Sequence, residues 1–169
     1  MPRKNVARLL RAFDVFRQYI KEDFRLVIAG ANKFGLNEVN ETLKNMAYKD
    51  SVLFVGRKSP DDLKKIVASA FALTYIPVFE GFGIPILEAF YCNVPVITSN
   101  VTSMPEVAGD AAILIDPYSV DSIKNGMLEL YHNQDLCKGL VQKAQERAKM
   151  FTWDKTANNL WQGIEKVPR

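Results

Sequence analysis

Short, continuously apolar runs alternate with segments of helical periodicity as far as residue 115. Each run is bounded by Gly, Pro or polar residues, as expected of strands that are covered on both faces of a sheet. The runs are FRLVIAG (24–30), VLFVG (52–56), FALTYIP (71–77), VPVIT (94–98) and AAILI (111–115). Helical patterns separate them near residues 4–20, 36–48, 60–70 and 84–92. This alternation predicts an α/β fold with a doubly wound parallel sheet of the Rossmann type.

Beyond residue 116 the pattern is helical throughout, near 119–132, 134–150 and 153–166. The chain has 169 residues, 48% of them hydrophobic, which is enough to bury a sizeable core. No internal repeat or linker interrupts it, so we predict a single domain over 1–169 with a helical tail. A parallel sheet normally feeds a helix from a strand, but RKNVARLLRAFDVF (3–16) enters a helix with no strand ahead of it. We therefore expect the chain to be part of a longer protein.

Charge and cysteine content narrow the class of protein. The net charge is +3 and the basic residues are scattered, which argues against a nucleic-acid partner. Cys92, Cys137 and the single histidine, His132, show no metal-ligand spacing, so no metal site is expected and both thiols are predicted to be free in a reducing cytoplasm. No apolar stretch is long enough to cross a bilayer. We expect a cytoplasmic location, and peripheral association with the inner face of the membrane stays open.

Local signals mark helix starts and packing residues. SPDD (59–62) offers Ser59 as a helix cap followed by Pro60. SMPE (103–106) has the spacing of a capping box. Trp153 and Trp161 are interpreted as packing residues of the last helix. Cys92 is assigned to the core, and His132 to the surface or to a helix end.

The segment FEGFGIPILEAF (79–90) joins an apolar run to a helical pattern and contains two carboxylates. It follows the third strand, so it lies at the carboxyl edge of the predicted sheet, where open parallel sheets bind ligands. Gly81 and Gly83 remove side chains where the backbone must approach a ligand or adopt a positive φ. Pro85 stands near the first helical position. The unpaired N–H groups at such a helix start, together with the helix dipole, can hold a phosphate.

Glu80 and Glu88 are eight steps apart. If all the steps were helical they would rise ~12 Å, which does not suit two carboxylates that share a proton or flank one bond. The spacing favours an extended ligand held at two places, with an anionic middle on the helix N-terminus, and a sugar nucleotide has this layout. Each residue alone also has a structural interpretation. Glu80 is then an exposed loop acid, and Glu88 a first-turn residue that complements the helix dipole.

Two further loops lie at the same predicted edge. Arg57 and Lys58 follow the second strand in GRKS (56–59) and could contact a base or a phosphate, although a solvated pair is equally consistent. AGANKFG (29–35) lacks the GxGxxG spacing, so it is interpreted as a turn, with Gly30 as a candidate ligand neighbour.

The segment 79–90 also resembles a known family. Glu80, seven intervening residues and Glu88 form the E-x7-E signature of retaining GT-B glycosyltransferases. The continuation AFYCNVPVITSNVTSMPEVAGDAAILIDP (89–117) resembles the stretch that follows this signature in glycosyltransferase group 1, also called family 4. RKN (3–5) and FTWDKTANNLW (151–161) are similar to the carboxyl-terminal half of that family, so the resemblance covers essentially the whole chain.

The resemblance implies two Rossmann-like domains that face a cleft, of which this chain corresponds to the second, donor-binding one. It implies that Glu80 contacts donor sugar hydroxyls near the reacting carbon and that Glu88 binds the ribose. Lys4 matches the lysine that holds the diphosphate, and the arginine usually paired with it would precede Met1. The resemblance also implies that the N–H groups of Phe82, Gly83 and Ile84 meet the diphosphate, with Gly81 in the same donor-binding loop.

The resemblance further implies a transferase that needs no metal or other cofactor and moves a hexose from a nucleoside-diphosphate sugar with retention of configuration. The second partner is a saccharide or lipid-linked acceptor held by an amino-terminal domain, so the chain alone is expected to be inactive. Family frequency favours mannose or glucose. The alternatives are a stand-alone nucleotide-sugar binding or regulatory module, or half of a GT-B epimerase or phosphorylase.

Overall fold

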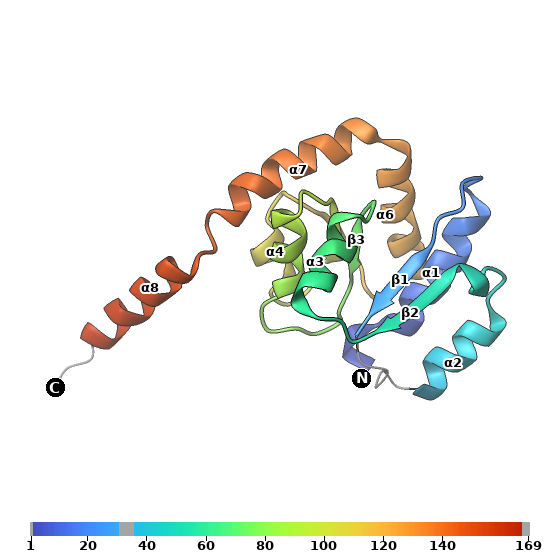
Figure 1. Cartoon of the computed structure of the whole chain (residues 1–169), viewed down its shortest axis with the longest axis horizontal. Helices are drawn as coiled ribbons and strands as arrows, with labels where there is room; N and C mark the ends of the chain where they lie inside the picture. The colour runs from blue at the N-terminus through green and yellow to red at the C-terminus, as the bar shows by residue number, and fades with distance from the viewer. Residues whose placement is uncertain (1, 31–35, 167–169) are drawn as a thin grey trace.

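The computed structural model describes residues 2–30 and 36–166 and has an α/β architecture (Figure 1). The strands are β1 (Leu26–Ala29), β2 (Val52–Gly56), β3 (Leu73–Tyr75), β4 (Val96–Ser99) and β5 (Ile113–Ile115). The α-helices are α1 (Val6–Gln18), α2 (Leu36–Asn45), α3 (Pro60–Ala68), α4 (Ile84–Tyr91), α5 (Met104–Ala108), α6 (Val120–His132), α7 (Gln134–Ala148) and α8 (Trp153–Glu165). Short 3₁₀ turns, η1 (Pro2–Lys4) and η2 (Lys49–Ser51), precede α1 and β2. All the predicted strands and helices are therefore present.

All strand pairs among the described residues are parallel, which confirms the predicted fold class. β1 pairs with β2, and β3, β4 and β5 form a second group with β4 in the middle. No hydrogen bonds join β1 to β3 in the part of the chain that the structure describes, so the strands form two groups instead of one continuous ladder. The helices between the strands and the helical tail after β5 complete the Rossmann-like arrangement.

Two clusters of buried side chains form the core. One gathers around α1 and α6 and includes Phe13, Phe16 and Leu130. The other lies around α4, α5 and α7 and includes Phe90 and Met104. Between them β4 is buried along its whole length, as predicted for a strand that is covered on both faces.

The prediction of two covered faces is wrong for β1 and β2. Val27 and Leu53 are register partners, yet they are 43% and 38% exposed. Successive side chains of a strand point to opposite faces, and the neighbouring Ile28 packs into the cluster around α1. One face of this strand pair is therefore covered and the other is open.

The two predicted helix caps have different outcomes. Ser59 caps α3 as expected, since its hydroxyl accepts from the N–H of Asp62 over 3.1 Å. The capping box at Ser103 is wrong, because this residue has helical φ and ψ and its side chain makes no cap hydrogen bond. Its hydroxyl instead donates to the carbonyl of Glu80, in the loop between β3 and α4.

Helix α8 extends away from the rest of the molecule (Figure 1). Trp153 and Trp161 are 87% and 61% exposed, so the prediction that they are packing residues is wrong for the described chain. Their helix leaves the body after Phe151, and its apolar side chains have no neighbouring layer among the described residues to pack against.

The outcomes for Cys92 and His132 differ. Cys92, predicted to lie in the core, is only partly buried, at the edge of the second cluster. His132 ends α6 at the surface, as predicted. Both cysteines are free. No helix in the described ranges is long and apolar enough to span a bilayer.

Candidate functional site

Lys4 and Glu80 form an ion pair beside the start of α4. Lys4 ends the 3₁₀ turn η1, and Glu80 lies in the loop between β3 and α4. The distance from Lys4 Nζ to Glu80 Oε2 is 2.6 Å, and the two side chains are 30% and 21% exposed. The pair is thus shielded on most sides but still reachable from solvent, as a ligand-binding pair must be.

Tyr75, the last residue of β3, completes a three-membered cluster. Its hydroxyl accepts from Lys4 Nζ over 2.9 Å and donates to Glu80 Oε2 over 2.9 Å. The hydrogen bond from Lys4 lowers the pKa of Glu80 below the ordinary glutamate value, so this carboxylate is ionised at neutral pH. Burial opposes the charge of Lys4, but hydrogen bonds to Glu80 and Tyr75 outweigh it and raise the pKa of Lys4. Burial raises the pKa of Tyr75, which keeps the hydroxyl neutral.

Asn5 fixes the backbone that presents Lys4. It is buried, has a left-handed φ of 59°, and precedes the first residue of α1. Its amide nitrogen donates to the carbonyls of Ile76 (3.1 Å) and Pro117 (2.7 Å), which follow β3 and β5. The N–H of Val78 also donates to the carbonyl of Arg3 over 2.9 Å. The amino-terminal segment is therefore attached to the strand ends that border the site.

Ser103 holds the backbone of Glu80. Its hydroxyl donates to the Glu80 carbonyl over 2.9 Å, from the loop between β4 and α5. Glu80 is thus held by Tyr75, five positions away, and by Lys4 and Ser103, which are 76 and 23 positions away in the sequence. Sequence reasoning missed Tyr75, Asn5 and Ser103 as site residues. Asn5 adjoins the candidate Lys4 and Tyr75 ends a strand, whereas Ser103 lies between β4 and α5 with no sequence signal for a site role.

The start of α4 has the conformation that the glycines predicted. Gly83 is the N-cap of α4 with φ 101°, and a Cβ there would lie 2.7 Å from Met104 Cε. Gly81 differs, because it lacks a positive φ and an added Cβ would meet open space. No described oxygen accepts from the N–H groups of Phe82, Gly83 or Ile84. Phe82 and Ile84 are exposed, so their N–H groups are available to an anion, whereas Gly83 is buried.

The structure does not gather all the predicted site residues. Glu88 is exposed and is the fifth residue of α4, so it is not a first-turn acid. Because α4 begins only at Ile84, the fully helical separation between Glu80 and Glu88 does not apply. Arg57 and Lys58 follow β2, are exposed, and make no described hydrogen bond or ion pair with the cluster. In the AGANKFG loop, Gly30 has φ 142° and residues 31–35 lie outside the described ranges.

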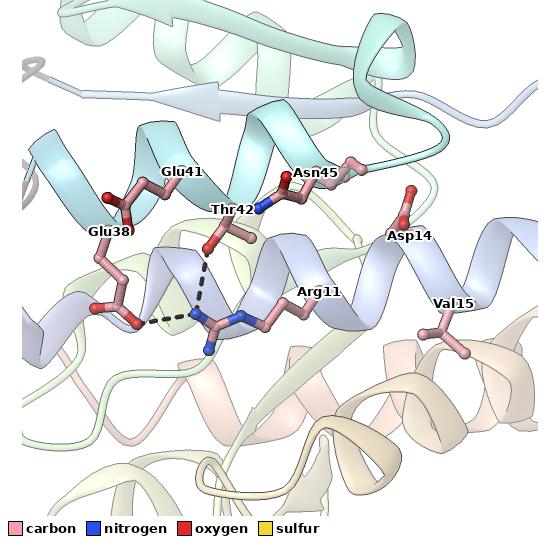
Figure 2. Close-up of a pocket in the computed structure, with 8 residues that line it drawn as sticks. Arg11, Asp14, Val15, Glu38, Glu41, Thr42 and Asn45 are labelled. Atoms are coloured by element: carbon pink, nitrogen blue, oxygen red, sulfur yellow. Dashed lines mark hydrogen bonds and ion pairs between the residues drawn. The ribbon is translucent and has the colours of Figure 1, made fainter.

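A separate groove lies between α1 and α2. Figure 2 shows Arg11 on α1, whose guanidinium donates to Glu38 and Thr42 of α2 over 3.2 and 3.3 Å. Its lining contains none of the predicted site residues. Across the described residues, no three His, Cys, Asp or Glu side chains are grouped so that they could hold a metal ion.

The family follows from a direct comparison. Residues 1–147 match the family model described as glycosyl transferases, group 1. The chain belongs to this family, and the matched range includes Lys4, Tyr75, Glu80 and Glu88.

Two curated relatives are mannosyltransferases. The chain is 32% identical over 153 residues to the O-antigen chain mannosyltransferase B of Escherichia coli, covering 90% of this chain and 40% of that protein. It is 26% identical over 168 residues to the serotype-specific mannosyltransferase WbdA of Escherichia coli, covering 98% of this chain and 21% of that protein. The chain thus spans less than half the length of these relatives.

Solved structures share the fold. Anabaena HepE in complex with UDP and glucose superposes with a TM-score of 0.86 and 16% identity, over 99% of this chain and 46% of that one. The C-terminal domain of the group 1 glycosyltransferase LpcC from Francisella tularensis gives a TM-score of 0.77 and 19% identity, over 89% and 80% of the two chains. The chain therefore has the Rossmann-like fold of a GT-B half.

Proposed function

We propose that this chain is the donor-binding, carboxyl-terminal domain of a retaining, metal-independent glycosyltransferase that moves a hexose from a nucleoside-diphosphate sugar. The observation that supports this most is the position of the Lys4–Tyr75–Glu80 cluster. Glu80 of this cluster lies three residues ahead of Gly83, the N-cap of α4, where the N–H groups have no described acceptor. Lys4 and the backbone donors at the start of α4 can bind a diphosphate, and Glu80 can bind the sugar that is linked to it.

The diphosphate is proposed to lie on the start of α4 and on Lys4. An ammonium group has three N–H donors, and the described residues use two of them, toward Tyr75 and Glu80. The third can donate to a phosphate oxygen, together with the N–H groups of Phe82, Gly83 and Ile84. Fixed positive charge and the helix dipole then stabilise the leaving diphosphate without a metal ion.

The sugar and the ribose are proposed to lie at the two glutamates. Glu80 Oε2 accepts from Lys4 and Tyr75, whereas no described residue donates to Oε1. Oε1 can therefore accept from a hydroxyl of the donor sugar, beside the carbon where positive charge develops. Glu88, exposed on α4, is proposed to bind the ribose. The names of the relatives favour mannose as the hexose, and the glucose and UDP in HepE support a sugar nucleotide as the ligand.

The acceptor is proposed to be a saccharide or a lipid-linked saccharide at the inner face of the membrane, bound by a part of the protein outside these 169 residues. Positioning of two substrates supplies much of an enzyme's rate. The 169-residue chain alone should therefore transfer no sugar, and turnover by the purified chain would contradict this part of the proposal.

Calorimetry with GDP, UDP and ADP, with and without EDTA, tests the proposed function. We expect at least one diphosphate to bind with the same affinity in both buffers. Binding of none of the three, or binding that requires added Mg²⁺, would overturn the proposal.

A further inference from the structure

The Tyr75 hydroxyl joins the two charged groups of the candidate site. It accepts from Lys4 Nζ and donates to Glu80 Oε2, each over 2.9 Å, although these residues lie 71 and 5 positions away in the sequence. A phenol has a single O–H donor, so Glu80 uses it entirely. Tyr75 belongs to neither the E-x7-E signature nor the RKN segment.

Tyr75 is the member of the cluster that lies in a strand. It ends β3 and is the register partner of Thr98 in the buried strand β4. The Thr98 hydroxyl also donates to the Tyr75 carbonyl over 2.7 Å. Lys4 and Glu80, in contrast, lie in a short 3₁₀ turn and a loop. The strand therefore supplies the fixed point against which the other two side chains are oriented.

Tyr75 also differs from Lys4 in what it can bind. A diphosphate competes with Glu80 for the Lys4 ammonium, because both are anions. It competes less for the Tyr75 hydroxyl, because this group is neutral and its one donor already meets a carboxylate. When Lys4 is shared between Glu80 and a diphosphate, Tyr75 is the described partner whose single donor stays entirely with Glu80.

Building on the proposed function, we propose that Tyr75 is a positioning residue for the donor sugar. Its hydroxyl holds Oε2 of Glu80, so that Oε1 is presented to a sugar hydroxyl while Lys4 contacts the diphosphate. Tyr75 itself touches neither the sugar nor the phosphates.

Tyr75→Phe tests this inference, since it removes the hydroxyl and keeps the ring that lies 5.1 Å from Lys4 Nζ. Calorimetry compares GDP with GDP-mannose and UDP with UDP-glucose on the 169-residue chain. We expect the affinity for the sugar nucleotide to fall about tenfold and that for the bare diphosphate to change less than about threefold. Tyr91→Phe is the matched control, because the Tyr91 hydroxyl donates to the Ala148 and Phe151 carbonyls, each over 3.3 Å, in contacts that involve no residue of the cluster.

A second measurement does not depend on any nucleotide. In the chain labelled with ¹³C-glutamate, the side-chain carboxyl shift of Glu80, assigned with Glu80→Gln, reports the pKa of this residue as pH is lowered. Tyr75→Phe should raise that pKa and Tyr91→Phe should not, because only Tyr75 donates to the carboxylate.

The outcomes separate the two proposals. If the wild-type chain binds no diphosphate, the proposed function fails, and the sugar-positioning role fails with it. If the wild type binds but Tyr75→Phe leaves the Glu80 pKa or the sugar contribution unchanged, only the role of Tyr75 is overturned. Equal losses for sugar nucleotide and bare diphosphate would also overturn it, because they would indicate a purely structural residue.

Discussion

Lys4 and Glu80 are 76 positions apart in the sequence, yet their side chains form an ion pair with an Nζ to Oε2 distance of 2.6 Å. The amino-terminal turn and the loop after β3 therefore make one site only in the folded chain. Asn5 and Ser103 hold the backbone on the two sides of the pair through hydrogen bonds to strand ends and to Glu80.

Replacing Lys4 with a neutral residue should change how the free energy of unfolding depends on pH. The pKa of Glu80 is lowered, so the pair's contribution is present above the unfolded value of about 4.3 and is lost as pH falls through the folded value. The pKa of Lys4 is raised, so the contribution is present below about 10.4 and is lost as pH rises through the folded value. Lys4→Met should therefore cost about 1 kcal/mol or less near neutral pH, and the difference from wild type should shrink toward both extremes.

Urea unfolding followed by circular dichroism measures this difference at several pH values. Lys149→Met is the matched control, because Lys149 also pairs over 2.6 Å, with Glu146, but both side chains are largely exposed. If the cost of Lys4→Met does not depend on pH, or if the control costs as much, the partly buried Lys4–Glu80 pair contributes no more to stability than an exposed pair does.

Gly83 and Gly81 should tolerate alanine differently. Gly83→Ala places a Cβ 2.7 Å from Met104 Cε at φ 101°, so it should destabilise the chain by about 1–2 kcal/mol. Gly81→Ala places its Cβ in open space without a positive φ, so its free energy of unfolding should change by less than about 0.5 kcal/mol. Urea unfolding compares the two, and equal costs would mean that the left-handed N-cap is not needed.

Ser103→Ala should loosen Glu80 without removing its charge. The lost hydrogen bond to the Glu80 carbonyl should cost about 1 kcal/mol of stability and weaken sugar-nucleotide binding a few-fold. Ser69→Ala is the control, since the hydroxyl of Ser69, the C-cap of α3, donates over 3.0 Å to the Ile66 carbonyl, in a contact that includes no site residue. A control that weakens binding as much as Ser103→Ala would indicate an indirect effect.

The tryptophans of α8 should contribute little to the stability of this chain. Trp153 and Trp161 are largely exposed, so replacing either with Ala should change the free energy of unfolding by less than about 0.5 kcal/mol. Phe151→Ala should cost more, because Phe151 is partly buried and packs edge-on against Phe82 with ring centroids 5.8 Å apart. Thermal unfolding ranks the three variants, and a large loss at Trp161 would mean that α8 packs on the body in solution.

The strands and helices were predictable because their signals are local. Alternating apolar runs and helical periods, with Ser59 as a cap, depend on neighbours in the sequence, and the structure contains every predicted element. The errors arose where the contacts of a residue depend on a partner that is distant in the sequence. Ser103 has the spacing of a capping box, but its hydroxyl bonds a carbonyl 23 positions away. Trp153 lies on an apolar helical stripe, but no described layer covers that stripe.

The candidate site was predictable in part. The E-x7-E signature and the resemblance identified Glu80, Glu88 and Lys4, and the structure brings Lys4 to Glu80. Tyr75 was missed because its apolar ring fits the strand pattern, and nothing in the sequence indicates that its hydroxyl meets a lysine 71 positions away. The roles of all the predicted site residues stay predictions, and no described contact joins Arg57, Lys58 or Glu88 to the cluster.

Calorimetry of Glu80→Gln and Glu88→Ala, with a bare nucleoside diphosphate and with the matching sugar nucleotide, tests whether the two glutamates hold opposite ends of one donor. Glu88→Ala should weaken both ligands by roughly ten- to a hundredfold, because both contain the ribose. Glu80→Gln should weaken only the sugar nucleotide, because the bare diphosphate has no sugar for this residue to contact. If Glu80→Gln loses the bare diphosphate as severely as Glu88→Ala does, or if neither change affects either ligand, the two glutamates do not hold opposite ends of one donor.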